Sequence, residues 1–222
     1  MTTDSRTEIL RRIRQALDGT TDGTPPDPAT IPRDYLTVHA HRTPEQSADL
    51  LADNLTDYRA HVHRTNEQDL PATLARLLTH HGTRTAITPP DLPHHWLSQT
   101  TGITITTPDE TTTTHTLDTA DTVITGCTLA IAETGTIILD STTAQGQRRI
   151  TLIPDHHICV IRTPQQIVDS IPQALPRLNP AHPQTWISGP SATSDIELTR
   201  IEGVHGPRTL DVILLTSSPQ SG

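Results

Sequence analysis

The sequence has no lysine, no phenylalanine and no long apolar run, and only two of its 222 residues are cysteine. Without lysine the motif G-x-x-x-x-G-K-[ST] cannot occur, so a P-loop nucleotide hydrolase is excluded. Cys127 and Cys159 are too few for a disulfide framework and are not spaced as a C-x-x-C pair, which predicts reduced, buried thiols. No segment approaches the roughly 18 consecutive apolar residues of a membrane-spanning helix. Charged residues interrupt the first 17 positions, which is unlike a signal peptide, so we expect a soluble, cytoplasmic protein.

Aromatic residues make up 2% of the chain, and its formal net charge is −9. Proteins that coat phosphate backbones or stack bases need the opposite composition, so neither nucleic acid nor a membrane is an expected partner. The serine nucleophile elbow G-x-S-x-G and the dinucleotide fingerprint G-x-G-x-x-G are also missing. A chain of this length suits one domain with a single sizeable core.

Three regions follow one another along the chain. Residues 1–18 form an amphipathic helix that opens with the capping box Ser5-x-x-Glu8. Residues 19–34 are rich in proline, glycine and threonine, which is typical of a flexible linker. Residues 35–217 then form one α/β domain. The linked helix is expected either to pack on this domain or to contact a partner or a second subunit.

The first half of the domain alternates helices with strands, which favours a mainly parallel sheet covered on both faces. Thr43-Pro44-Glu45-Gln46 is a capping box with proline at the first helical position, and it opens a helix that runs to about residue 57. The other elements expected here are a strand at 61–63, a helix at 66–80, strands at 85–88 and 103–106, a helical turn at 94–98 and a polar loop at 107–119.

After residue 121 short β-rich runs follow one another without room for helices, which indicates an antiparallel or mixed part of the sheet. These runs lie at 122–125, 129–132, 136–139, 150–153 and 158–161. A helix at 164–175, a strand at 186–188, a helical turn after Ser191 and a last strand at 210–215 complete the expected fold.

The segment S-G-P-S-A-T-S-D-I-E at 188–197 follows a strand and leads into the expected helical turn. Such a junction directs free backbone N–H groups and hydroxyls to one place, where a phosphate or carboxylate can be held. The alternative is that Ser191 and Thr193 only cap the helix and that the acidic residues only match its dipole. The candidate ligand-binding residues in this segment are Gly189, Ser191, Thr193 and Asp195.

Two further loops carry an ionisable side chain beside glycine. The motif E-T-G at 133–135 lies between apolar β runs, where a carboxylate needs a partner or a role as base or nucleophile, unless the turn is a hairpin with a solvated glutamate. The motif G-V-H-G-P at 203–207 suits contact with an anion near neutral pH, or it is an ordinary surface loop. The candidate catalytic residues are therefore Glu133 and His205, and the candidate ligand-binding residues are Thr134, Gly135, Gly203 and Gly206.

Histidine pairs with the spacing H-x-H occur at His39 and His41 and at His61 and His63. Two imidazoles on one face of a strand can chelate a metal, but the chain has 13 histidines, so chance is the better interpretation and we predict no metal ligand. His157 differs because it is one of two adjacent histidines at the start of a β run, where strand alternation sends one imidazole inward. We expect His157 to contact a ligand.

Four segments together resemble the LUD-domain family. They are I-A-E-T-G-T at 131–136, P-x-x-H at 154–157, S-G-P-S-x-T-x-D-I-E at 188–197 and G-V-H-G-P at 203–207. The resemblance covers residues 43–215 in order and spacing, whereas the linker and the threonine-rich segment at 107–119 fall outside the shared motifs.

The resemblance implies a three-layer α/β/α sandwich similar to the NagB/RpiA/CoA-transferase superfamily, with a partly antiparallel portion in the C-terminal half. It also implies a non-redox role in the oxidation of L-lactate to pyruvate, in which this chain binds a small carboxylate or acyl ligand beside iron–sulfur partner proteins. Two cysteines cannot hold an iron–sulfur cluster, so we expect no cofactor in this chain and place the clusters on the partners. A homo-oligomer is compatible with this role.

Two alternatives stay open. CoA-transferases of that superfamily use a glutamate beside a glycine as a nucleophile on an acyl group, and Glu133 is similar in kind, so a CoA-transferase-like or hydrolytic enzyme is the second interpretation. A structural or regulatory subunit that docks through its N-terminal helix is the third. The first two interpretations suppose that Glu133, the hydroxyls at 191–193 and His205 face one common cavity.

Overall fold

The computed structural model describes residues 3–18, 30, 32, 34, 36–142, 145–193, 201–202 and 206–216. The chain divides into two compact units, residues 1–35 and residues 36–222. Among the helices in these described ranges, none is both long enough and apolar enough to cross a lipid bilayer.

The first unit contains the helix α1 (Thr3–Asp18), which confirms the predicted N-terminal helix. The carboxylate of Glu8 forms ion pairs with Arg11 at 2.7 Å and with Arg12 at 2.8 Å, one turn further along. The apolar residues Ile9 and Ile13 are 58% and 48% exposed. Side-chain pairs at i,i+3 and i,i+4 spacing, rather than a buried core, therefore support this helix.

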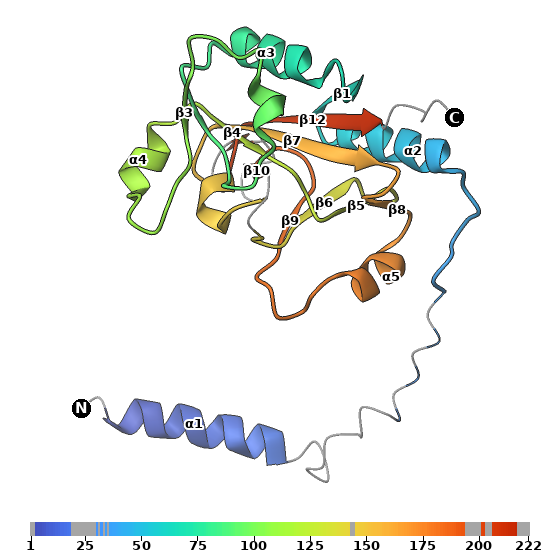
Figure 1. The fold of residues 1–222 in the computed structure, drawn as a ribbon. Helices are drawn as coiled ribbons and strands as arrows, with labels where there is room; N and C mark the ends of the chain where they lie inside the picture. Colours follow the sequence, from blue (N-terminus) through green and yellow to red (C-terminus); the bar gives the residue numbers. More distant parts are fainter. Residues whose placement is uncertain are drawn as a thin grey trace. The chain divides into compact units, whose positions relative to one another are not determined.

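A six-stranded parallel sheet forms the centre of the second unit (Figure 1). Its strands lie in the order β1-β12-β7-β4-β2-β3, and every neighbouring pair is parallel. The two strands β7 and β12 are buried along almost their whole length, as expected for a parallel sheet covered on both faces. The strand bounds are β1 (His61–Asn66), β2 (Thr85–Ile87), β3 (Thr104–Thr106), β4 (Thr122–Thr125), β7 (His156–Thr163) and β12 (Thr209–Thr216).

One face of this sheet is covered by α2 (Pro44–Asp57). Leu51 and Leu55 are fully buried there and belong to the largest core cluster. Both cysteines lie in the same cluster, and their thiols are free and buried, as predicted. The pKa of the Cys127 thiol is raised well above its ordinary value, because it contacts the Cys159 thiol and because burial disfavours the thiolate. The sheet residues that complete this cluster include Ile161, Leu210, Val212 and Leu214.

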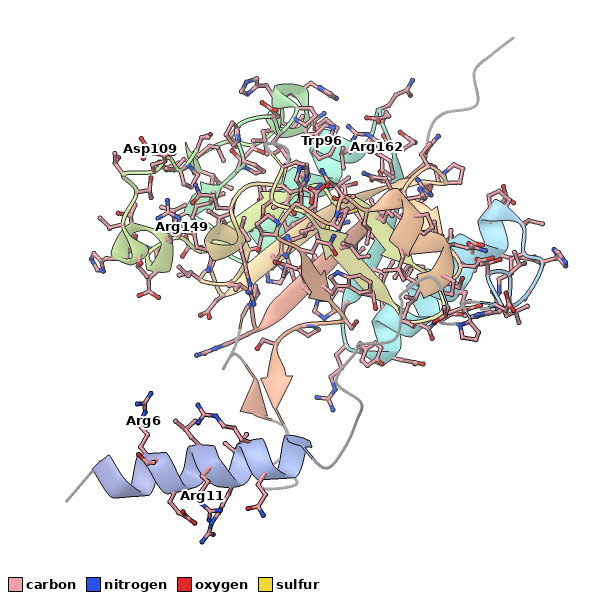
Figure 2. All side chains as sticks on the ribbon, turned by 90° about the horizontal axis from the view of Figure 1, so that it is seen from below. Arg6, Arg11, Trp96, Asp109, Arg149 and Arg162 are labelled. Carbon is pink, nitrogen blue, oxygen red and sulfur yellow. The ribbon has the colours of Figure 1, made fainter. Side chains whose placement is uncertain are left out.

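The opposite face is covered by α3 (Leu70–His80) and the short 3-10 helix η2 (His94–Leu97). Leu74 and Leu78 of α3 and Trp96 of η2 pack there against the apolar side chains of β4, β7 and β12. The guanidinium of Arg162 lies over the Trp96 ring at 5.2 Å from its centroid (Figure 2). Helices on both faces of a parallel sheet confirm the predicted three-layer α/β fold.

A second, smaller sheet follows the order β8-β5-β6-β9. The strands β5 and β6 form an antiparallel hairpin, β6 and β9 are also antiparallel, and β5 and β8 are parallel. This sheet is the mixed portion predicted for the C-terminal half. Its strands are β5 (Leu129–Ile131), β6 (Thr136–Leu139), β8 (Ile167–Val168) and β9 (Thr185–Ile187).

The predicted alternation over residues 43–106 is confirmed, but α3 begins at Leu70 rather than near residue 66. The Asn66 side-chain oxygen accepts hydrogen bonds from the backbone N–H groups of Gln68 and Asp69, both at 2.9 Å. An Asx turn therefore occupies the residues between β1 and α3.

The capping box of α2 is present as predicted. Thr43 Oγ1 accepts from the Gln46 N–H at 3.3 Å, and the Gln46 side chain accepts from the Thr43 N–H at 2.9 Å. We expect Thr43→Ala to lower the free energy of unfolding by about 1 kcal/mol, because one helical N–H then loses its acceptor. Urea denaturation measures the change. Thr56→Ala, in the last turn of the same helix, is the control, and an equal loss in both variants would contradict a capping role for Thr43.

Two predicted elements between residues 107 and 153 are wrong. The polar loop contains a helix, α4 (Thr114–Asp118), whose N-cap Thr113 accepts from the Thr116 N–H at 3.2 Å. The expected strand at 150–153 is instead the end of a 3-10 helix, η3 (Arg148–Thr151). Both short helices exist because they bury an apolar side chain in one cluster, Leu117 from α4 and Ile150 from η3.

The predicted helix at 164–175 is also wrong over most of its length. A turn held by Gln166 follows β7, since its side chain accepts from the Arg162 N–H at 2.7 Å and donates to the Cys127 carbonyl at 2.5 Å. The β-branched pair that follows forms β8, and helix appears only in α5 (Ile171–Ala174) and the 3-10 turn η4 (Leu175–Arg177). Pairing with β5 thus outweighs the local helical pattern.

The segment after Ser191 is a strand rather than the predicted helical turn. β10 (Ala192–Thr193) pairs antiparallel with β11 (Ile201–Glu202). The residues between these two strands lie outside the described part of the chain. Ser191 is therefore not the N-cap of a helix in the described structure, and the anion site expected at a helix N-terminus is not formed in that way.

Candidate functional site

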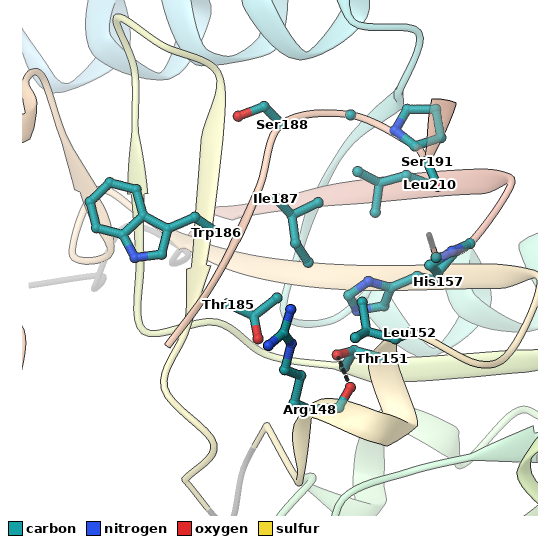
Figure 3. Close-up of a pocket in the computed structure, with 14 residues that line it drawn as sticks. Arg148, Thr151, Leu152, His157, Thr185, Trp186, Ile187, Ser188, Ser191 and Leu210 are labelled. Atoms are coloured by element: carbon teal, nitrogen blue, oxygen red, sulfur yellow. Dashed lines mark hydrogen bonds between the residues drawn. The ribbon is translucent and has the colours of Figure 1, made fainter. Parts of the chain in front are cut away.

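A cavity of about 320 Å³ lies beside the starts of β7 and β12. Its walls come from η3, from β9 and the segment that follows it, from the loop that precedes β12, and from the first residues of β7 and β12 (Figure 3). The side chains that line it are mainly small, polar or aliphatic. They belong to Arg148, Thr151, Leu152, His157, Thr185, Trp186, Ile187, Ser188, Pro190, Ser191, Pro207 and Leu210, with Gly189 and Gly206 contributing backbone.

His157 lies at the inner wall of this cavity. The residue is 1% exposed, and its Nε2 lies 2.8 Å from Thr125 Oγ1. Burial, with a smaller contribution from the neighbouring His156, lowers the pKa of His157 to about 3. At neutral pH the imidazole is therefore neutral, so it can donate or accept one hydrogen bond towards a ligand.

Arg148 supplies positive charge at the same cavity. Its guanidinium is exposed and is directed towards Thr185 (Figure 3). It forms no ion pair with any residue in the described ranges, whereas the adjacent Arg149 is held by the carbonyls of Asp109 and Thr112, both at 2.6 Å. Within the described residues this guanidinium has no carboxylate partner, and Thr151, Thr185 and Ser188 line the same cavity, so the arrangement suits a small carboxylate.

The outer wall depends on Gly189, whose φ is +80°. A Cβ atom on this residue would lie 2.5 Å from the Tyr58 carbonyl oxygen, at a distance that no real side chain tolerates. The next turn is fixed by a hydrogen bond from the Ser191 N–H to the Pro207 carbonyl at 2.8 Å. That N–H is therefore already used within the protein.

Glu133 lies in the hairpin turn between β5 and β6, where Gly135 adopts a φ of +55°. Its carboxylate is held between His39 Nδ1 at 2.6 Å and Arg42 Nη1 at 3.0 Å. Burial favours the neutral carboxyl, but hydrogen bonds from both partners outweigh it and hold the pKa of Glu133 below its ordinary value. Glu133 is thus an ionised, paired carboxylate.

The cavity does not bring Glu133 and Ser191 together, because Glu133 is not among the described residues that line it. That part of the prediction is wrong: the hairpin turn directs the carboxylate towards the segment before α2 instead. A chain of hydroxyls still links the two places. Thr136 Oγ1 lies 2.8 Å from Thr134 Oγ1 and 2.9 Å from Ser188 Oγ, and Ser188 lines the cavity.

Comparison with known proteins identifies the family. The family model of the LUD domain matches residues 48–215. This chain belongs to the LUD-domain family. It is similar to lactate utilization protein C of Deinococcus radiodurans, with 40% identity over 220 residues, which cover 96% of this chain and 97% of that protein. Lactate utilization protein C of Bacillus subtilis is 35% identical over 101 residues, or 42% of this chain and 41% of that protein.

A solved structure has the same fold. The crystal structure of a DUF162 family protein from Deinococcus radiodurans, at 1.70 Å resolution, aligns with a TM-score of 0.66 and 33% identity, covering 79% of this chain and 99% of that one. The resemblance to LUD domains stated from the sequence motifs is thereby confirmed.

The LUD domain places the predicted site residues in three groups. Thr134 and Gly135 lie in the hairpin turn with Glu133, outside the described cavity lining. Asp195, Gly203 and His205 lie outside the described residues, as does the side chain of Thr193 in β10. The roles of all these residues stay predictions. The predicted residues that line the cavity are His157, Gly189, Ser191 and Gly206.

Sequence reasoning missed Arg148 and Thr151, which form one wall of the LUD-domain cavity. Neither residue was predicted, because the composition of residues 150–153 indicated a strand instead of the 3-10 helix that carries both side chains. The signal in the sequence was the adjacent pair Arg148-Arg149. In the structure Arg149 donates to two backbone carbonyls, whereas Arg148 lines the cavity.

Proposed function

We propose that this LUD-domain protein is a non-redox component of a system that oxidises L-lactate to pyruvate, and that it binds a small carboxylate in the cavity beside His157. The observation that carries the proposal is the guanidinium of Arg148 at a cavity that hydroxyls, aliphatic side chains, the indole of Trp186 and a neutral imidazole also line. A volume of about 320 Å³ accommodates a three-carbon acid with its bridging water.

The relatives support the choice of substrate class. Proteins named lactate utilization protein C match this chain, in one case along almost its whole length. Lactate and pyruvate each carry one carboxylate for Arg148 and one oxygen at the neighbouring carbon. That oxygen is suited to His157 or to a cavity hydroxyl.

The redox centres are assigned to partners in this proposal. An iron–sulfur cluster needs about four cysteine ligands, and this chain has two cysteines, both buried in the core. The partners would then be cysteine-rich iron–sulfur proteins. Reconstitution tests this assignment: lactate-dependent reduction of an electron acceptor by the partner proteins should rise when this chain is added. No change on addition would count against the assignment.

Calorimetry with L-lactate and pyruvate tests the ligand. We expect Arg148→Gln to weaken binding about 10- to 100-fold, because a hydrogen bond to a charged group contributes about 1.5–3 kcal/mol. Arg76→Gln, which removes the same charge from the exposed surface of α3, is the matched control and should bind as the native protein does. If the native chain binds neither acid, alone or with its partners, the cavity does not have this role.

The paired carboxylate of Glu133 favours a second candidate, a CoA-transferase-like or hydrolytic enzyme. Its low pKa keeps it ionised, as a nucleophile requires, although Arg42 and His39 stabilise the charge that an attack would consume. A panel of acyl-CoA thioesters separates the candidates. Acyl transfer that is lost in Glu133→Gln would establish this second function, and an inert native protein would eliminate it.

A further inference from the structure

A second cluster of ionisable side chains lies on the other face of the central sheet. His156 and His157 are adjacent on β7, so their side chains point to opposite faces. His157 faces the cavity described above, whereas His156 Nε2 lies 2.8 Å from Asp211 Oδ2. His81 Nε2 lies 2.9 Å from the same oxygen. One ligand atom each from His81, His156 and Asp211 thus lies within 4.8 Å of the others.

Three separate elements place these side chains. His156 is the first residue of β7, and Asp211 is the third residue of the neighbouring strand β12. His81 follows the last residue of α3, where its backbone N–H donates to the Leu77 carbonyl at 3.0 Å. The end of a helix and the beginnings of two parallel strands therefore converge at one point.

The cluster contains a charge that must be compensated. The Asp211 side chain is 1% exposed and that of His156 is 7% exposed. A buried carboxylate is costly unless hydrogen bonds or a cation compensate it. The imidazole N–H groups can provide the first kind of compensation, and the same nitrogens, when deprotonated, can bind a cation that provides the second.

Asp211 and His156 each have a second polar atom, besides the one in the cluster, that is also hydrogen-bonded. Oδ1 of Asp211 is bonded to His63 Nε2 at 2.5 Å, and His156 Nδ1 lies 3.0 Å from Thr122 Oγ1. Thr122 Oγ1 in turn lies 2.8 Å from Thr83 Oγ1. Metal-binding histidines and carboxylates typically have such outer partners, because these fix the ring orientation and the tautomer.

A route from solvent reaches the cluster. His81 and His156 line a cavity of about 400 Å³. Its lining also contains three carboxylates and one guanidinium. The guanidinium is that of Arg208, whose Nε lies 3.5 Å from Asp155 Oδ1. The excess of negative charge favours entry of a cation rather than an anion. The carboxylates are Asp118, Asp121 and Asp155.

We propose that His81, His156 and Asp211 bind one divalent transition metal ion of the Zn²⁺ type, which enters through this cavity. Two imidazole nitrogens and one carboxylate oxygen are a ligand set for such ions at about 2.0–2.2 Å, and the coordination positions that face the cavity are left to water. His63 and Thr122 position the ligands. This site shares no residue with the cavity beside His157, so metal binding and carboxylate binding can be tested independently.

Titration of the chelator-treated full chain with Zn²⁺ by calorimetry, and with Co²⁺ by visible absorption, tests the proposal. We expect one ion per chain, d–d bands of a nitrogen and oxygen site with Co²⁺, and a rise in Tm with Zn²⁺. His81→Gln should weaken Zn²⁺ binding at least 10-fold. Loss of an outer partner typically weakens metal binding about 10- to 100-fold, and loss of a direct ligand should cost at least the lower of these values.

The matched control is His80→Gln, which removes the neighbouring exposed histidine and should bind as the native chain does. Asp211→Asn, which keeps the shape of the side chain, is a second variant, and circular dichroism reports whether each variant is folded. Equal binding by His80→Gln and His81→Gln, or failure of the native chain to take up one ion, would overturn the proposal.

Discussion

Replacing Asp211 with alanine is expected to lower the free energy of unfolding by about 3–5 kcal/mol, the range for removing one partner of a buried ionic network. The carboxylate accepts from His63, His81 and His156 at 2.5–2.9 Å. Burial would raise the pKa of Asp211, but hydrogen bonds from His156 and His63 outweigh that effect and hold the pKa far below its ordinary value. Without the carboxylate these imidazoles lose a common acceptor.

Urea denaturation in the presence of a chelator measures this effect, so that bound metal does not contribute. Asp49→Ala is the control, since Asp49 also forms a short ion pair, with Arg64 at 2.6 Å, but its side chain is 63% exposed. Exposed pairs of this kind contribute at most about 1 kcal/mol. Similar losses in the two variants would show that the buried network does not stabilise the fold.

Acidification below pH 6.5 is expected to destabilise the protein by up to about 1.4 kcal/mol for each pH unit through His157. The unfolded chain takes up a proton on this residue near its ordinary pKa of 6.5, whereas the folded protein does so only at about 3. Between these values the unfolded state binds more protons, so stability rises with pH. The contribution is complete above pH 6.5 and is lost as the pH falls towards 3.

The slope of stability against pH in His157→Gln tests this prediction. Glutamine can still hydrogen-bond to Thr125 but does not titrate. Unfolding free energies measured between pH 7 and pH 4 should fall less steeply in the variant than in the native protein. His94→Gln, which removes an exposed histidine of η2, should leave the slope unchanged. Parallel curves for His157→Gln and the native chain would show that His157 titrates normally.

Local signals in the sequence predicted the elements that local interactions hold. The capping box at Thr43 corresponds to hydrogen bonds between residues three positions apart. The strands up to residue 106 were found from their pattern alone, although β1 pairs with the distant β12. The prediction of a helix at 164–175 was wrong because pairing with a distant strand determines the structure of this segment. Ile167 and Val168 pair with Ala130 and Ile131, about 37 residues earlier in the chain, and no pattern within the interval reports that pairing.

The same distinction holds for the candidate sites. His157 was accessible to prediction because strand alternation alone turns one of two adjacent histidines inward. Arg148 was not, because its position depends on a 3-10 turn set by packing of Ile150. The cluster at Asp211 joins side chains that are 55 and 130 positions apart in sequence. The H-x-H pair was interpreted as chance, although His63 Nε2 lies 2.5 Å and His61 Nδ1 3.9 Å from Asp211 Oδ1.

The two free thiols offer a way to follow motions of the fold without any added label. Both sulfurs sit beneath α2, and contact between them keeps the Cys127 sulfur protonated. Because only a thiolate reacts with alkylating or disulfide reagents, modification has to wait until α2 lifts from the sheet or the chain unfolds. The rate of alkylation therefore reports how often this part of the core opens, and a slower rate with lactate or pyruvate present would report that the acid holds the domain closed.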